Sequence, residues 1–186
     1  MKRFVTTLIG AAFVLLPGLL AAQDPTKADA MQNCPMHQQH MQTQDHDSHH
    51  ALVEKHGDQA MGFARDKTTH HFRLLADGGA IEVRANDPAD KTSTDAIRSH
   101  LSHIAAAFGD GDFSTPMFVH DSVPPGVTTM KLLKDKIRFA YEELPAGGRV
   151  RIASSDAVAI AAVQDFLRFQ ITEHQTGDPL ALEEAH

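Results

Sequence analysis

The chain has almost none of the residues that build covalent cross-links. Its 186 residues include one cysteine, Cys34, together with a single tyrosine and no tryptophan. A lone cysteine has no intramolecular partner, so in an oxidising compartment it is a free thiol, an intermolecular disulfide or a metal ligand. A fold held by internal disulfides is therefore excluded.

An excess of basic residues is also absent, as are the common catalytic motifs. The formal net charge is −7, and without Lys2 and Arg3 the balance is 15 basic against 24 acidic residues, or −9. Nucleic-acid binding needs a basic surface, so we expect no nucleic-acid partner. The sequence has no Gly-x-Ser-x-Gly elbow, His-Glu-x-x-His pair or phosphate-binding glycine loop. We therefore expect no catalysis, and a metal-dependent enzyme is only the third hypothesis.

Residues 1–22 have the pattern of a secretory signal peptide. A basic start, Met1–Arg3, precedes an apolar stretch that ends in Ala21-Ala22 and is broken by Pro17-Gly18. An uncleaved membrane anchor is the alternative, but a spanning helix needs about 20 apolar residues without such a break. We expect cleavage after Ala22 and a mature protein that is periplasmic or secreted and free of the membrane.

Residues 23–59 form a polar tail rich in histidine and methionine. Aliphatic residues are nearly absent before residues 51–53, so this segment is predicted to be disordered. Thiolate, thioether and imidazole groups occur together in it, and such ligands favour Cu(I), with Zn(II) as the second choice. The alternative interpretation is a solvated histidine-rich linker. The candidate ligands of the tail are Cys34, Met36, His37, His40 and Met41.

The segment Cys34-Pro35-Met36-His37 resembles a known metal motif. It is similar to the Cys-Pro-Met-His core of the small heavy-metal-binding motif attached to periplasmic efflux adaptors and copper-transporting ATPases. The match covers four residues, and the family pattern continues with proline where this chain has Gln38. The resemblance implies ligand roles for Cys34, Met36 and His37, and a metal-transport or efflux protein as partner.

The rest of the chain repeats one pattern twice, in residues 68–112 and 136–178. Each copy has two alternating apolar runs around a turn with a Gly-Gly pair, followed by an amphipathic helix. One such unit cannot cover its own sheet face, so two units should pack into one core. We therefore predict an α+β domain over residues 60–178, in which duplicated ββα units pack antiparallel sheet against two helices. Residues 179–186 are predicted to be a frayed end.

Within this pattern the helices are expected to begin near Thr94 and after Asp156. The Gly-Gly pairs at residues 78–79 and 147–148 are expected to belong to the hairpin turns. In the connector between the two units, Met117–His120 is predicted to add a short strand.

Five histidines of the predicted domain are candidate metal ligands. His70 and His71 are adjacent at the start of a strand, so they point to opposite faces. His100 and His103 lie one helical turn apart, a spacing that can chelate a metal. His120 lies in the connector, where binding groups often occur. For each of the first four, a structural role in packing or hydrogen bonding is the alternative.

The domain also resembles a group of uncharacterised secreted bacterial proteins. The matching segments are residues 68–72, 123–126, 166–171 and 174–178. Some members of that group carry an aspartate carbamoyltransferase label. That enzyme is a two-domain cytosolic protein with a Ser-Thr-Arg-Thr-Arg carbamoyl-phosphate loop, which this sequence lacks. The resemblance therefore implies secretion but no activity.

The sequence leads to two main hypotheses about function. The first is a periplasmic or secreted protein that binds a soft metal such as copper and acts as buffer, chaperone or sensor. The alternative is a non-catalytic interaction module that forms a homodimer, with the histidine-rich tail as tether. The broad apolar surface predicted for the last helix favours this alternative.

Overall fold

The computed structural model describes residues 48, 51–57 and 60–183. The chain divides into compact units 1–42 and 43–186, and every described residue belongs to the second. The predicted signal peptide and the tail ligands Cys34, Met36, His37, His40 and Met41 lie outside the described residues. In the part that is described, no helix is long and apolar enough to cross a membrane.

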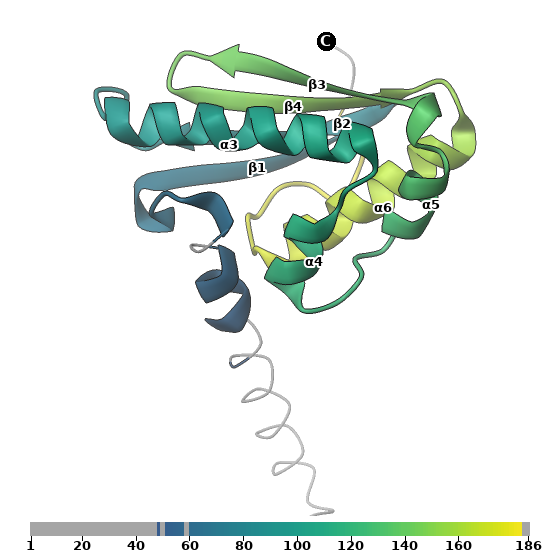
Figure 1. The fold of residues 1–186 in the computed structure, drawn as a ribbon, viewed down its shortest axis with the longest axis horizontal. Coiled ribbons are helices and arrows are strands. Elements are labelled where there is room, and N and C mark those ends of the chain that lie inside the picture. The colour runs from purple at the N-terminus through teal and green to yellow at the C-terminus, as the bar shows by residue number, and fades with distance from the viewer. Residues whose placement is uncertain (1–47, 49–50, 58–59, 184–186) are drawn as a thin grey trace, which may run out of the picture. The chain divides into compact units, whose positions relative to one another are not determined.

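A four-stranded antiparallel sheet forms the centre of the domain (Figure 1). Its strands lie in the order β1-β2-β4-β3, so each repeat contributes one hairpin, and the second strands of the two hairpins pair in the middle. The two repeats therefore share one sheet, and the predicted α+β fold of duplicated ββα units is confirmed. The strands are β1 (Thr68–Leu75), β2 (Gly78–Ala85), β3 (Ile137–Leu144) and β4 (Gly147–Ser154).

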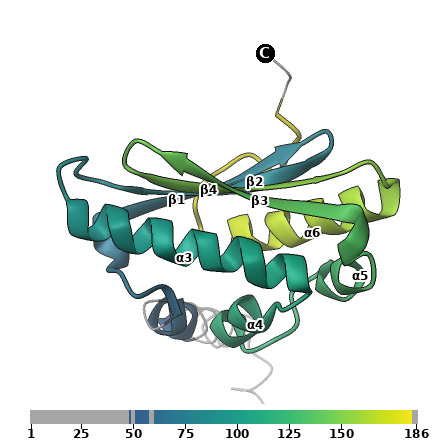
Figure 2. The same cartoon turned by 45° about the horizontal axis from the view of Figure 1, so that its top comes forward.

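The labelled helices all lie on the same side of this sheet (Figure 2). The long helices α3 (Lys91–Asp110) and α6 (Ala157–Glu173) each follow one hairpin and pack against it. The connector between the repeats forms α4 (Ser114–His120) and α5 (Val127–Leu132). Two short 3-10 turns, η1 (Arg65–Lys67) and η2 (Lys134–Lys136), precede the two hairpins.

The core lies between the helices and the covered face of the sheet. Alternate strand residues face the helices, and one apolar stripe of each long helix faces the strands. Helix α6 is buried by the sheet and by α5. Most of the apolar surface of α6 is thus used inside the domain, whereas Val158 near its start is exposed. The main core residues are Phe72, Leu74, Ile81, Val83, Ile97, Leu101, Phe108, Val150, Ile152, Val163, Phe166 and Leu167.

The glycine pairs begin the second strand of each hairpin, so their predicted place in the turns is wrong. The turns are residues 76–77 and 145–146. A Cβ atom on Gly79 would lie 2.2 Å from Leu167 Cδ1 and 2.3 Å from the Arg73 carbonyl oxygen. A Cβ atom on Gly147 would lie 2.0 Å from the Val83 carbonyl oxygen. These glycines are needed because neighbouring backbone and side chains approach closely.

Two helix predictions also need correction. Helix α3 begins at Lys91, before the predicted Thr94, because the Asp90 carboxylate accepts a hydrogen bond from the Ser93 amide at 3.0 Å. The strand predicted at Met117–His120 of the connector is wrong, since these residues belong to α4. Just before that helix the Ser114 amide donates a hydrogen bond of 2.8 Å to the Asp112 carboxylate, and the helix buries Pro116 and Val119 on one side.

The C-terminal segment is held against the edge strand β1. The Asp178 carboxylate accepts a hydrogen bond from the Phe72 amide at 2.9 Å, and the Glu183 amide donates to the Leu74 carbonyl oxygen at 2.8 Å. Arg73 forms an ion pair with Glu183 at 2.7 Å. Residues 179–183, predicted as part of a frayed end, are joined to β1 through the backbone and the side chain of Glu183.

Candidate functional site

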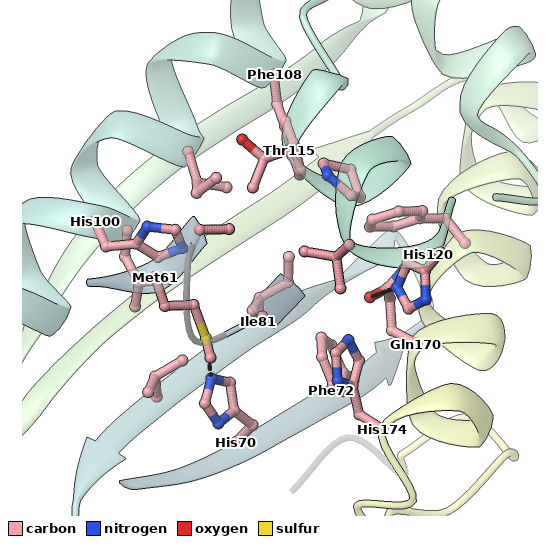
Figure 3. A pocket seen from close by; sticks show the side chains of 18 residues that line it. Met61, His70, Phe72, Ile81, His100, Phe108, Thr115, His120, Gln170 and His174 are labelled. Carbon is pink, nitrogen blue, oxygen red and sulfur yellow. Dashed lines mark hydrogen bonds between the residues drawn. The ribbon is translucent and has the colours of Figure 1, made fainter. Parts of the chain in front are cut away.

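A cavity of about 90 Å³ lies between the helix-covered face of the sheet and the helices (Figure 3). Most of its wall is apolar, formed by core residues of β1, β2, α3 and α6. Four imidazole rings and one thioether interrupt this apolar wall. They belong to His70, His100, His120, His174 and Met61.

Met61, His70 and His100 lie at one end of the cavity (Figure 3). The Nε2 atom of His70 is 3.2 Å from the Sδ atom of Met61. Phe63 packs against both rings, stacked on His70 with a centroid distance of 6.1 Å and edge-on to His100 at 5.7 Å. Strand β1, helix α3 and the helical residues before Phe63 thus bring three metal-ligand types of side chain to one place. We call these three residues the Met-His cluster.

Both imidazoles of the Met-His cluster are held neutral at neutral pH. Burial, with repulsion from Arg65 and the neighbouring rings of His100 and His71, lowers the pKa of His70 from 6.5 to about 4. Burial, with repulsion from His103, lowers the pKa of His100 to about 4 as well. A neutral imidazole keeps a ring nitrogen lone pair, which is what a metal ion or a hydrogen-bond donor requires.

His120, Gln170 and His174 lie at the other end of the cavity (Figure 3). His120 is 2% exposed, and its Nε2 atom forms a hydrogen bond of 3.1 Å with the Gln170 Oε1 atom. Its Nδ1 atom lies 4.0 Å from a carboxylate oxygen of Glu173, and its ring packs on that of His174 at a centroid distance of 5.1 Å. This end is an internal hydrogen-bonded and aromatic cluster that joins α4 to α6.

The structure brings three of the five predicted histidines of the domain to one cavity. His70, His100 and His120 line it. His71 lies on the opposite face of the sheet from His70, as the strand pattern predicted, and its Nδ1 atom is 2.8 Å from the Asp178 carboxylate. His103 is exposed on α3. His70 and His71 therefore do not share a site, as the strand geometry predicted, and His100 and His103 do not form the predicted chelating pair.

Sequence reasoning gave no site role to three residues of the cavity. Met61 lies shortly before His70 and His71 in the sequence, and a thioether near two histidines is a usable signal. A histidine near a helix C-terminus, such as His174, is favoured by the helix dipole. The sequence therefore gave no reason to assign His174 to a cavity. Gln170 lies in an otherwise apolar stretch, and no sequence pattern indicated that its amide would be buried beside His120.

A larger polar cavity of about 540 Å³ adjoins the Met-His cluster. Met61, His70 and His174 line both cavities, so they separate the polar space from the apolar one. Glu54 and Arg65 line the polar cavity and form an ion pair of 3.1 Å. This pairing offsets the positive charge of Arg65 near the cluster. Met61 and His70 therefore border a polar space as well as the apolar cavity.

Among the residues that the structure describes, no three His, Cys, Asp or Glu side chains gather as a metal site. The Met-His cluster has a different composition, because one of its three groups is a thioether. In comparisons with known proteins, the chain matches no family model, no curated protein and no solved structure.

Proposed function

We propose that this protein binds a soft metal ion, copper(I) in the first place, as a periplasmic or secreted buffer, chaperone or sensor. The observation that carries the proposal is the contact of 3.2 Å between Met61 Sδ and His70 Nε2. The sequence already supplies a soft-ligand tail around Cys34, and the Met-His cluster adds a second place for the same cargo.

The distance between these two atoms fits two ligands of one ion. Metal–nitrogen bonds of about 2.0 Å and metal–sulfur bonds of about 2.3 Å, at a tetrahedral angle, separate the two donor atoms by about 3.5 Å. A shift of a few tenths of an ångström in the flexible Met61 side chain gives this separation. His100 would supply the third ligand, from the same end of the cavity.

The donor set favours Cu(I) over Zn(II). Thioether and imidazole ligands select Cu(I), whereas structural zinc is held by four tetrahedral ligands drawn from Cys, His and carboxylates. The low pKa values of His70 and His100 also help, because neither ring must lose a proton before it binds metal at neutral pH. Zinc is therefore the second choice for this cluster, as it is for the tail.

A competition titration of the full chain with Cu(I) and a chromogenic chelator tests this function. We expect tight binding that falls by one equivalent in Met61→Leu and in His70→Asn. A variant with Cys34→Ser and Met36→Leu should lose the tail equivalents and keep the cluster equivalent. His103→Asn is the matched control, because it removes an exposed imidazole one helical turn from His100.

Two results would contradict the proposal at different levels. If Met61→Leu and His70→Asn keep the full stoichiometry and affinity, the Met-His cluster is not a ligand set and the tail alone binds metal. If the wild-type chain binds neither Cu(I) nor Zn(II) more tightly than about 1 μM, metal cargo as a function is wrong.

A further inference from the structure

The two edges of the sheet differ in how they are covered. Hydrogen bonds from the C-terminal segment cover β1, as described above. On the other edge, the backbone of residues 138–143 forms its ladder with β4, and no hydrogen bond to another described residue crosses its outer side. An open edge of this kind is a template for pairing with another strand.

The side chains of β3 are complementary to those of a second, antiparallel β3. If a two-fold axis passes through Ala140, then Arg138 lies opposite Glu142 of the other copy, and Phe139 lies opposite Tyr141. Arg138 and Glu142 lie on the outer face of the sheet, whereas Phe139 and Tyr141 lie on the helix-covered face. Opposite charges and aromatic pairs are both favourable cross-strand partners.

Neighbouring registers lose this match. An axis through Phe139 or Tyr141 places no arginine opposite a glutamate. An axis between two residues would place Arg138 opposite Glu143, but these side chains lie on different faces of the sheet. That register would turn the helix layer of the second copy to the opposite side. Of these registers, only the one centred on Ala140 pairs the opposite charges and places the helices of both copies on the same side of the extended sheet.

The contacts that Arg138 and Glu142 make within the chain leave both side chains able to form ion pairs with a second copy. Arg138 is exposed and has no ion pair with any described residue. Glu142 pairs with Arg149 at 3.2 Å, but its side chain is 44% exposed and can accept a second guanidinium. The exposed guanidinium of Arg138 can therefore bind a carboxylate of a second copy of the chain.

We propose that a second copy of this chain binds along β3, with the two-fold axis at Ala140, and extends the sheet from four to eight strands. Such an isologous contact closes the β3 edge, and at the β1 edge the C-terminal segment already binds the Phe72 amide and the Leu74 carbonyl oxygen. The contact uses none of the residues of the Met-His cluster, so it is independent of metal binding.

Sedimentation velocity on the full chain, over a concentration series with and without a copper chelator, tests this interface. We expect a monomer–dimer equilibrium that ignores the chelator and weakens at high salt. Arg138→Glu and Glu142→Arg should each weaken dimerisation about tenfold or more, because each creates two like-charge contacts per dimer. The double variant should return to within about threefold of wild type. Lys55→Glu is the control, because it makes the same change of charge on an exposed helix residue before β1.

Mixing the two single variants gives the sharpest result. Each should be largely monomeric alone, whereas a mixture should form a heterodimer in which the two glutamates of the Arg138→Glu copy meet the two arginines of the Glu142→Arg copy. A wild-type chain that stays monomeric at about 1 mM overturns the proposal. A dimer that both single variants leave unchanged overturns it too, since it would use another surface. If the mixture of the two single variants does not form a heterodimer, the proposal is also overturned.

Discussion

The two repeats differ most where they meet the cavity. His70 is the third residue of β1, and Phe139 is the third residue of β3. Aligned by the Gly-Asp pairs that follow the helices, His100 of α3 corresponds to Phe166 of α6. The second repeat thus uses phenylalanine for packing where the first has an imidazole. Since phenylalanine packs at the corresponding positions of the second repeat, a ββα unit of this kind does not need histidine there in order to fold.

The outer face of the sheet shows a second difference between the repeats. Glu82 is the fifth residue of β2, and Arg151 is the fifth residue of β4. The Glu82 side chain is 1% exposed and pairs with Arg73 at 3.2 Å and with Arg84 at 3.4 Å, besides Arg149. Burial opposes its ionisation, but the hydrogen bond and charge of Arg149, with the other two guanidinium groups, hold the pKa of Glu82 below its usual range.

Replacing this central carboxylate should have the largest effect on stability. We expect Glu82→Gln to lower the free energy of unfolding by about 3 kcal/mol, since three guanidinium groups would lose their common partner. The partial exposure of the arginines keeps the cost below that of a fully buried site. The control is Asp165→Asn, whose exposed pair with Arg168 at 3.2 Å should contribute less than about 1 kcal/mol. Urea unfolding at pH 7 measures both, and equal effects would contradict the central role of Glu82.

Making the first repeat like the second should remove a pH dependence of stability. His70 has a pKa of about 4 in the folded chain against 6.5 when unfolded. Above pH 6.5 neither state binds the proton. As pH falls from 6.5 to 4, the unfolded state binds it first, so the free energy of unfolding falls by up to about 3 kcal/mol.

The variant His70→Phe, which copies Phe139, should lack this part of the pH dependence. Urea unfolding of metal-free protein at pH 7 and pH 4.5 checks this, with His103→Asn as an exposed control. Carboxylates also titrate in this range, so the contribution of His70 is the difference in pH dependence between wild type and His70→Phe. Identical pH dependence in wild type and His70→Phe would show that His70 is not held neutral by the fold.

The close glycines should respond alike in both repeats. We expect Gly79→Ala and Gly147→Ala each to destabilise the domain by about 2 kcal/mol, because the new Cβ atom would lie within 2.3 Å of a backbone oxygen. Gly109→Ala is the control. Apart from its chain neighbours and the backbone of its own helix, no described atom lies within 4 Å of its Cβ position, and α3 should gain about 0.5–1 kcal/mol. Thermal unfolding would contradict the close packing if all three variants behaved alike.

Much of this fold could be predicted because its signals are local. Alternation around residues 72–85 and 137–152 predicted both hairpins, and the helical stripe from Ile97 to Phe108 predicted the face that α3 buries. The errors arose where a distant contact decides the structure. The glycine pairs were assigned to turns because the sequence does not reveal that Leu167 and the neighbouring strand lie against them. The C-terminal residues look solvated, yet their backbone and carboxylates complete the edge of β1.

The candidate site was predicted by residue type, but the grouping of its residues was not. The chain by itself determined the α+β class, the supply of histidine and methionine, and the opposite directions of His70 and His71, since these follow from composition and strand geometry. Only the tertiary structure decided that His70 meets Met61 and shares a cavity with His100, while His103 faces solvent. Sequence neighbours on a helix or strand diverge around its axis, whereas packing of separate elements brings distant side chains within contact, and that packing made the site.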